Sequence, residues 1–245
     1  MKKTLIATSL MAASTATMAE ISGNVALATD YVFRGFSQTD NQIALQGGLD
    51  FAHESGFYIG TWASNVDSDF FNTTSSTTRD PQLELDVYAG YSGELANGIG
   101  YDLGVLHYDY PGYSDADTDE IYVSGSYKGF SASLNYSDEL SFIGSDQSAW
   151  YLKGAYETTL PWYEVGFSAH LGYNYGDAYD VSDSDRLKGD SGFYDSYTDW
   201  SIGFSKAVYG VDLGLTYTDL DLNSKDDCNK DYCDSKVVFS VSKSL

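Results

Sequence analysis

Histidines and cysteines carry much of the metal-binding and nucleophilic chemistry of proteins, and this chain has three of the first and two of the second. They are His53, His107, His170, Cys228 and Cys233. They form no cluster with carboxylates that is typical of a catalytic metal, and no GxSxG turn exposes a nucleophilic serine. The sequence therefore argues against a metalloenzyme and against a serine hydrolase of that kind.

His170 has a hydroxyl near it in the sequence, that of Ser168, and both fall on one face of a predicted strand. Residues two apart in a strand are roughly 7 Å apart along the backbone, which by itself builds no catalytic dyad. His53 and His107 fall on the opposite face, which we assign below to lipid. We therefore expect no enzymatic activity and no cofactor.

The cysteines lie close together near the end of the chain, in DDCNKDYC. In a secreted chain this spacing favours a local Cys228–Cys233 disulfide over a metal-binding pair. With no histidine beside them and no second cysteine pair, a zinc site is poorly supported.

The acidic segment DADTDE resembles the start of an EF-hand calcium loop, with Asp115, Asp117 and Asp119 in the required spacing. Glu120 occupies the place of the required glycine, so we predict no dedicated metal site. Loose calcium binding at the surface stays open.

The first nineteen residues have the features of a secretory signal peptide. Lys2 and Lys3 precede an apolar stretch over residues 5–13, and Thr17 and Ala19 are the small residues before the expected cleavage point. We expect cleavage after Ala19, which leaves residues 20–245 as the mature protein.

The composition limits both the partners and the class of the protein. A formal charge of −23 means that the chain repels nucleic acid. Its 22 Tyr, 12 Phe and 4 Trp give it enough apolar surface to fold despite that charge. No apolar run approaches the roughly 18 residues of a membrane helix, so the chain can enter a membrane only as strands.

The mature sequence alternates between apolar and polar residues, which is the period of a strand with one apolar face. In the clearest segment, Leu83, Leu85 and Val87 alternate with Glu84 and Asp86. About twelve such segments follow one another, each near the length of a tilted membrane strand. They are residues 21–33, 42–53, 57–65, 82–92, 99–109, 118–128, 129–137, 147–158, 162–174, 196–205, 208–219 and 235–245.

The links between these segments alternate between short and long without a break, as the turns and loops of outer-membrane barrels do. A soluble β-sandwich shares the residue alternation but does not predict this alternation of link lengths. We therefore predict an all-β protein, a single transmembrane antiparallel up-and-down β-barrel of about twelve strands over residues 20–245.

Aromatic residues gather toward the strand ends, where a membrane barrel carries its interfacial girdles. We expect the girdles to include Tyr31, Phe33, Phe57, Tyr58, Tyr91, Tyr101, Tyr108, Tyr110, Trp162, Tyr163, Tyr173 and Tyr175.

The polar faces then line the lumen. Barrels of eight strands are filled by their side chains and barrels of sixteen hold an open channel, so about twelve strands predict a narrow lumen. The pore-lining candidates are Asp30, Arg34, Gln46, Asp50, Glu84, Asp86, Lys153, His170, Asp199 and Lys236. Their excess of carboxylates predicts a preference for cations. Closure of the barrel is expected to bring Asp30 and Arg34 toward Lys236, either as a basic wall facing the acidic one or as a salt-bridged seam.

The block from Asp30 to Asp67, with ELDVYAGYSGEL and YDLGVLHYDYPG after it, resembles the TorF porin family of Gram-negative bacteria. The resemblance spans essentially the whole mature chain. It implies a barrel, an outer-membrane location and a channel activity without catalytic residues. The chain ends on Leu245 where such barrels usually present an aromatic residue to the assembly machinery, although Val237 and Phe239 keep the alternating signal.

We therefore expect an outer-membrane pore for the passive passage of small solutes or ions. Its partners would be outer-membrane lipid, the permeating solute and, during insertion, the barrel-assembly machinery. Two alternatives stay open: a closed barrel with a structural or adhesive role, and a channel specific for a nucleoside-sized solute.

Overall fold

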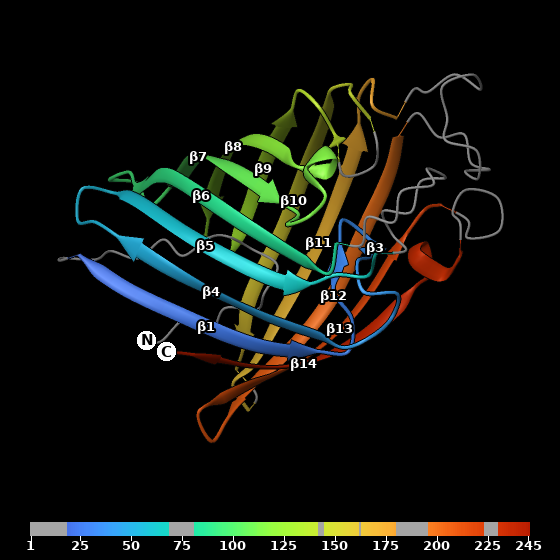
Figure 1. Cartoon of the computed structure of the whole chain (residues 1–245). Helices are drawn as coiled ribbons and strands as arrows, with labels where there is room; N and C mark the ends of the chain where they lie inside the picture. Colours follow the sequence, from blue (N-terminus) through green and yellow to red (C-terminus); the bar gives the residue numbers. More distant parts are fainter. Residues whose placement is uncertain (1–18, 69–80, 142–144, 162, 180–195, 223–229) are drawn as a thin grey trace.

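The protein is described from a computed structural model of the whole chain (Figure 1). The residues that the structure describes are 19–68, 81–141, 145–161, 163–179, 196–222 and 230–245. The predicted signal peptide and Cys228 lie outside these ranges, apart from Ala19.

Twelve long strands form one closed antiparallel barrel. They are β1 (Glu20–Ala28), β4 (Ala44–Ala52), β5 (Phe57–Asn65), β6 (Leu83–Glu94), β7 (Gly100–Asp109), β8 (Thr118–Tyr127), β9 (Phe130–Ser137), β10 (Ala149–Leu160), β11 (Val165–Tyr175), β12 (Ser196–Val208), β13 (Val211–Leu220) and β14 (Lys236–Ser244). Each pairs with its neighbour in the chain, and β1 pairs with β14 to close the cylinder. The predicted fold class is confirmed.

The first residues of β1 and the last residues of β14 lie at the same end of the barrel (Figure 1). We call this the turn end, because short turns join the strands there, and the opposite end the loop end. Short 3-10 helices, Ser114–Ala116 and Lys230–Cys233, belong to links at the loop end. Within the described ranges, no helix is both long and apolar enough to cross a bilayer.

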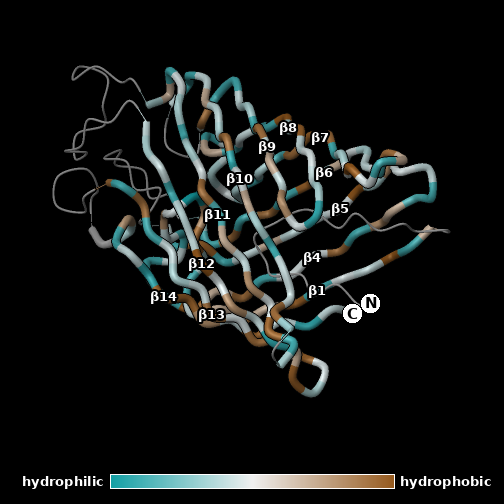
Figure 2. The backbone as a smooth tube through the Cα atoms, turned by 180° about the vertical axis from the view of Figure 1, so that it is seen from behind, coloured by the Kyte–Doolittle hydropathy of each residue, from teal (hydrophilic) through white to brown (hydrophobic). Residues whose placement is uncertain are grey.

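The barrel carries its apolar residues outside and its polar residues inside, the reverse of a soluble protein. On β6, Leu83 is 42% exposed and faces outward, whereas the adjacent Glu84 is 2% exposed and faces inward. The hydropathy colours alternate along the strands for the same reason (Figure 2). A strand points successive side chains to opposite faces, so this one pattern produces both an apolar belt and a polar lumen.

The first strand ends sooner than the sequence predicted. It stops at Ala28, and in the link that follows, residues 30–40 leave the wall and fold into the loop end of the barrel, whereas residues 41–43 are exposed. Tyr31 and Phe33 were expected in an outward girdle, but they pack inside, where Tyr31 meets Trp62 and Phe33 meets Tyr108. The alternation of apolar and polar residues predicts the face of a side chain only within a strand of the sheet, and here the chain has left the sheet.

Three further girdle assignments are wrong. Tyr108 and Tyr110 are almost completely buried inside the loop end. Tyr58 also faces inward, where its hydroxyl donates to Asp102. Other aromatic residues do pair near the strand ends, as expected. These pairs are Phe57 with Tyr91, Tyr91 with Tyr101, and Tyr173 with Tyr175.

A charge on the outer face should therefore be far more harmful than the same charge in the lumen. Val105 lies outward near the middle of β7, and Ser133 lies on the inner face of β9. We expect Val105→Arg to lower the free energy of unfolding from lipid vesicles by about 2–4 kcal/mol, the cost of an arginine near the bilayer midplane. Ser133→Arg should cost much less in the same urea titration. Equal losses would contradict the assignment of faces.

Candidate functional site

Residues 29–43, which we call the inward loop, include a small hairpin inside the barrel. Its strands are β2 (Val32–Phe33) and β3 (Phe36–Ser37). Arg34 and Gly35 make the turn between them, both with positive φ, at 45° and 89°. A two-residue turn of this kind matches the twist of a hairpin, and glycine adopts its conformation without steric cost.

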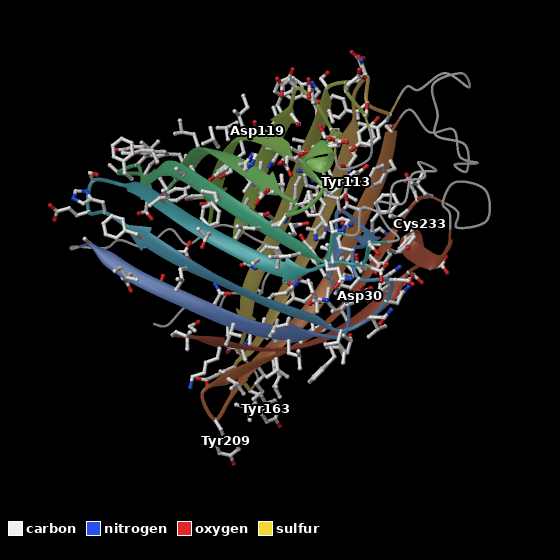
Figure 3. All side chains as sticks on the ribbon, in the orientation of Figure 1. Asp30, Tyr113, Asp119, Tyr163, Tyr209 and Cys233 are labelled. Carbon is white, nitrogen blue, oxygen red and sulfur yellow. The ribbon has the colours of Figure 1, made fainter. Side chains whose placement is uncertain are left out.

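Asp30 holds the base of this hairpin together. Its carboxylate accepts hydrogen bonds from the Ser37 hydroxyl at 2.6 Å and from the Thr39 hydroxyl at 2.8 Å. The backbone N–H of Gln38 donates to the carbonyl of Tyr31 at 2.7 Å. Burial raises the pKa of Asp30, and the two hydroxyl donors oppose this rise by stabilising the carboxylate. In Figure 3, Asp30 lies among the side chains gathered at the loop end.

The inward loop reaches across the lumen and touches walls on several sides. The Tyr31 hydroxyl of the loop donates a hydrogen bond to Glu84 on β6, at 2.7 Å. Its ring contacts are edge-on, with centroids 5.2 to 5.8 Å apart, and join Tyr31 to Trp62 on β5, Phe33 to Tyr108 on β7, and Phe36 to Tyr197 on β12. The loop end of the lumen is therefore constricted by the chain's own first link.

The tip of the hairpin lies against the far wall. A Cβ atom added at Gly35 would come within 2.6 Å of the Leu220 side chain and 3.1 Å of the Asp199 side chain. Gly35 is thus required twice, once for its positive φ and once for its close approach to the wall.

Arg34 forms a buried ion pair with Glu120 on β8. The distance between the guanidinium and the carboxylate is 2.5 Å, and the side chains are 6% and 1% exposed. The guanidinium also lies over the ring of Tyr151, 4.4 Å from its centroid. Burial disfavours the charged form, but Glu120 outweighs it, so the pKa of Arg34 lies above its usual range and the group stays charged.

This pairing differs from the predicted one, which placed Arg34 near Lys236. Lys236 does face Asp30, whose charge it influences. Its ammonium donates to the backbone carbonyls of Tyr232 and Asp234, at 3.0 and 2.7 Å, and so fastens the last link. The predicted basic wall is therefore absent from the described lumen, because Arg34 crosses to the acidic side and Lys236 bonds to the backbone.

The acidic wall is centred on β6 and β8. Glu84 accepts from the hydroxyls of Tyr31 and Tyr110, at 2.7 and 2.8 Å. Asp86 lies two residues further along the same inner face, close enough to Glu84 and Glu120 to feel their charges. Its Oδ1 atom is buried without a hydrogen-bond partner among the described residues. The constriction therefore carries more carboxylates than the Arg34 guanidinium can neutralise.

Phenols and carboxylates continue this wall toward the turn end. Tyr58 donates to Asp102 at 2.7 Å, and Tyr88 donates to Asp50 at 2.5 Å. The Tyr88 ring lies against Gly60, where a Cβ atom would be 2.5 Å away. Because Gly60 has no side chain, the Tyr88 ring can lie along the wall.

The wall from β11 to β14 is different, because small hydroxyl side chains dominate it. They are Ser168, Ser201, Ser205, Thr216, Ser240 and Ser242. Of the ten predicted pore-lining residues, Asp30 and Arg34 lie on the inward loop, and the other eight lie on the inner face of the strands. Gln46 and Asp199 are buried there, whereas Asp50, Lys153 and His170 are half-buried.

His170 has a partner that the sequence reasoning missed. The Ser201 hydroxyl lies 2.7 Å from Nδ1 of His170, and Nε2 lies 2.8 Å from Asp199. Asp199 also accepts from Tyr151 and Asn174. The chain of contacts runs across β11 and β12, which are aligned by the pairing of His170 with Ser201, and the sequence alone does not give this register.

The order serine, histidine, aspartate is that of a catalytic triad, but the geometry lacks a second requirement. Acyl transfer needs N–H donors aimed at a developing oxyanion. Ser201 lies inside regular ladders with both β11 and β13, where strand N–H groups bond across the sheet. The arrangement therefore fixes the orientation of His170, and the backbone N–H groups of this strand are taken up by its ladders.

Two other sequence predictions concern the loop end. Cys233 is disulfide-bonded, whereas Cys228 lies outside the described residues. His107, Asp109 and Asp117 have ligand atoms within 4.8 Å of one another at the outer rim, a grouping that could hold a metal ion. Groups of exposed acids are common without an ion, so the absence of a metal site stays a prediction.

The comparisons with known proteins agree with the architecture. A family model described as "Bacterial protein of unknown function (Gcw_chp)" matches residues 12–245. The chain belongs to the Gcw_chp family. Among curated proteins, no match to the sequence was found.

Solved structures resemble this Gcw_chp barrel in fold. One is the KdgM porin in complex with disordered oligogalacturonate, with a TM-score of 0.53, 10% identity, and coverage of 93% of this chain and 99% of that one. Another is the NanC porin, with a TM-score of 0.51, 10% identity, and coverage of 91% and 98%. At this identity the likeness concerns the fold alone.

Gly35 offers a direct test of the inward loop. We expect Gly35→Ala to destabilise the protein by about 1–2 kcal/mol for the left-handed backbone, with a further loss from contact with Leu220. Two glycines serve as controls. Gly210 has a similar positive φ but open space around its Cα atom, and Gly154 has open space without a positive φ. Thermal unfolding should rank the losses in the order Gly35, Gly210, Gly154. A loss at Gly35 no larger than at Gly210 would contradict the packed hairpin.

Proposed function

We propose that this protein is an outer-membrane channel for the passive passage of small solutes or ions. The observation that carries the proposal is the combination of a closed barrel, an apolar exterior and an interior lined by carboxylates, phenols and hydroxyls. The resemblance of the sequence to the TorF porin family supports the same function. Export with cleavage after Ala19 and insertion by the barrel-assembly machinery belong to this proposal.

Conductance of the purified protein in planar bilayers tests the channel. The inward loop narrows the loop end, so we expect small unitary currents that grow when its anchor is removed by Asp30→Ala. Zero current across salt and voltage, for both proteins, would instead favour a closed structural barrel.

We further propose that the channel prefers cations. The support is the excess of carboxylates at the constriction, where Glu84 and Asp86 lie on the same wall as Glu120, the ion partner of Arg34. A ring of carboxylates in a low-dielectric wall concentrates cations and excludes anions.

Removing a charge from the constriction should shift this selectivity. Under a salt gradient we expect Glu84→Gln to move the reversal potential toward that of an unselective pore, because the local negative potential falls when this carboxylate, which accepts from two phenols, is removed. Asp119→Asn is the matched control, since Asp119 is highly exposed on the outer face and contacts His107. The proposal fails if both variants keep the potential of the wild type, or if both shift it equally.

We propose that the barrel is not an enzyme, in spite of the contacts among Ser201, His170 and Asp199. We expect a fluorophosphonate probe to leave Ser201 unlabelled in intact protein, as judged by mass spectrometry, because the backbone N–H groups of its strand are taken up by ladders with β11 and β13. His170→Ala should keep the conductance. Labelling of Ser201 that disappears in His170→Ala would refute a purely passive channel.

A further inference from the structure

The surroundings of Arg34 have the composition of a site that recognises an organic cation. We call Glu120, Tyr108 and Tyr151 the Arg34 cage. Glu120 contacts the guanidinium at 2.5 Å, and Tyr151 presents its ring face at 4.4 Å from the central carbon. Tyr108 lies beside both and donates to Glu120 at 3.3 Å. A carboxylate combined with aromatic faces is the chemistry that binds guanidinium and substituted ammonium groups.

The fixed part of this site belongs to the barrel, and only the cation belongs to the inward loop. Tyr108, Glu120 and Tyr151 lie on β7, β8 and β10, whose ladders hold them in place. Asn135 on β9 donates to the second oxygen of Glu120 at 3.1 Å and further fixes its position. The cage therefore keeps its shape if the hairpin tip withdraws, and a cation from solution can take the place of Arg34.

The charge around the cage favours such an exchange. Asp86 is buried, lies near the charge of Glu120, and has an Oδ1 atom without a hydrogen-bond partner among the described residues. Glu84 adds a further carboxylate on the same face of β6. Glu84 accepts from the Tyr31 and Tyr110 hydroxyls and adds negative charge beside the Glu120–Arg34 pair, so an incoming cation is attracted before Arg34 has moved.

We propose that the Arg34 cage binds the guanidinium or alkylammonium group of a solute, and that this solute displaces Arg34 and releases the inward loop. Arg34 then acts as an internal competitor that keeps the constriction closed until a cationic solute arrives. The inference rests on the proposed channel function and deepens it, since it names the class of solute. Anions are repelled by the cage, and neutral solutes gain neither the ion pair nor the contact with the ring.

Chemical rescue tests the cage without reference to conductance. Arg34→Ala empties the cage and leaves Glu120 buried without its ion partner, which lowers the thermal midpoint of the purified protein. We expect millimolar guanidinium chloride to raise that midpoint, and sodium chloride at the same ionic strength to leave it unchanged. Isothermal titration should detect tighter guanidinium binding to Arg34→Ala than to the wild type, in which Arg34 competes for the cage.

Matched variants separate the cage from general effects. In Arg34→Ala with Glu120→Gln, guanidinium binding should weaken by at least about tenfold, because the charge-assisted hydrogen bonds are lost. Lys128→Ala removes a cation from the Tyr127 ring at the turn end, 5.0 Å from its centroid, and should give no rescue. The proposal is overturned if guanidinium acts no better than sodium on Arg34→Ala, or if the double variant responds equally. Should Arg34→Ala fail to fold, Arg34→Gln enters the same comparison.

Conductance then tests the release of the loop. We expect arginine methyl ester to increase the open probability of the wild type, and Arg34→Ala to be open without it. If guanidinium rescues Arg34→Ala but the protein never conducts, the binding site is supported and the proposed channel function is refuted. Conduction by Arg34→Ala without any guanidinium binding would keep the channel and overturn the cage.

Discussion

The structure depends on one constraint, that backbone amides in hydrocarbon must bond to one another. A sheet meets this constraint only when its two edge strands pair, and here β1 pairs with β14 over residues 24–28 and 240–244. Closure then gives the strands an inside and an outside, and the alternation of each strand supplies an apolar belt and a polar lumen together. The lumen owes its carboxylates and hydroxyls to the same geometry that satisfies the membrane.

A polar lumen creates a second requirement, because buried carboxylates need partners. The protein meets it with phenols and with the inward loop. Glu84 accepts from Tyr31 and Tyr110, and Glu120 accepts from Arg34, so two of these three donors come from residues 29–43. The loop is thus held by the charges of the wall it blocks. This reciprocity explains how a link between two strands becomes the constriction of the lumen.

The fold was predictable because it rests on local alternation, which any strand of the sequence displays on its own. Strands such as Leu83–Glu94 agree with their predicted positions within a few residues. The prediction was wrong at the inward loop, where the alternation continued in the sequence but the chain left the sheet. Tyr31 and Phe33 have the spacing of an outward pair, and only the fold of residues 29–43 turns them inward.

The sequence by itself determined the barrel, its strand number and the inward faces that carry Glu84, Asp86 and His170, because each of these follows from the period of a strand. Only the tertiary structure decided which residues meet across the lumen. The ion pair of Arg34 with Glu120 joins positions 86 residues apart, and His170 meets Ser201 through the register of two strands. Such meetings depend on closure and register, which are properties of the whole sheet and are absent from any single segment.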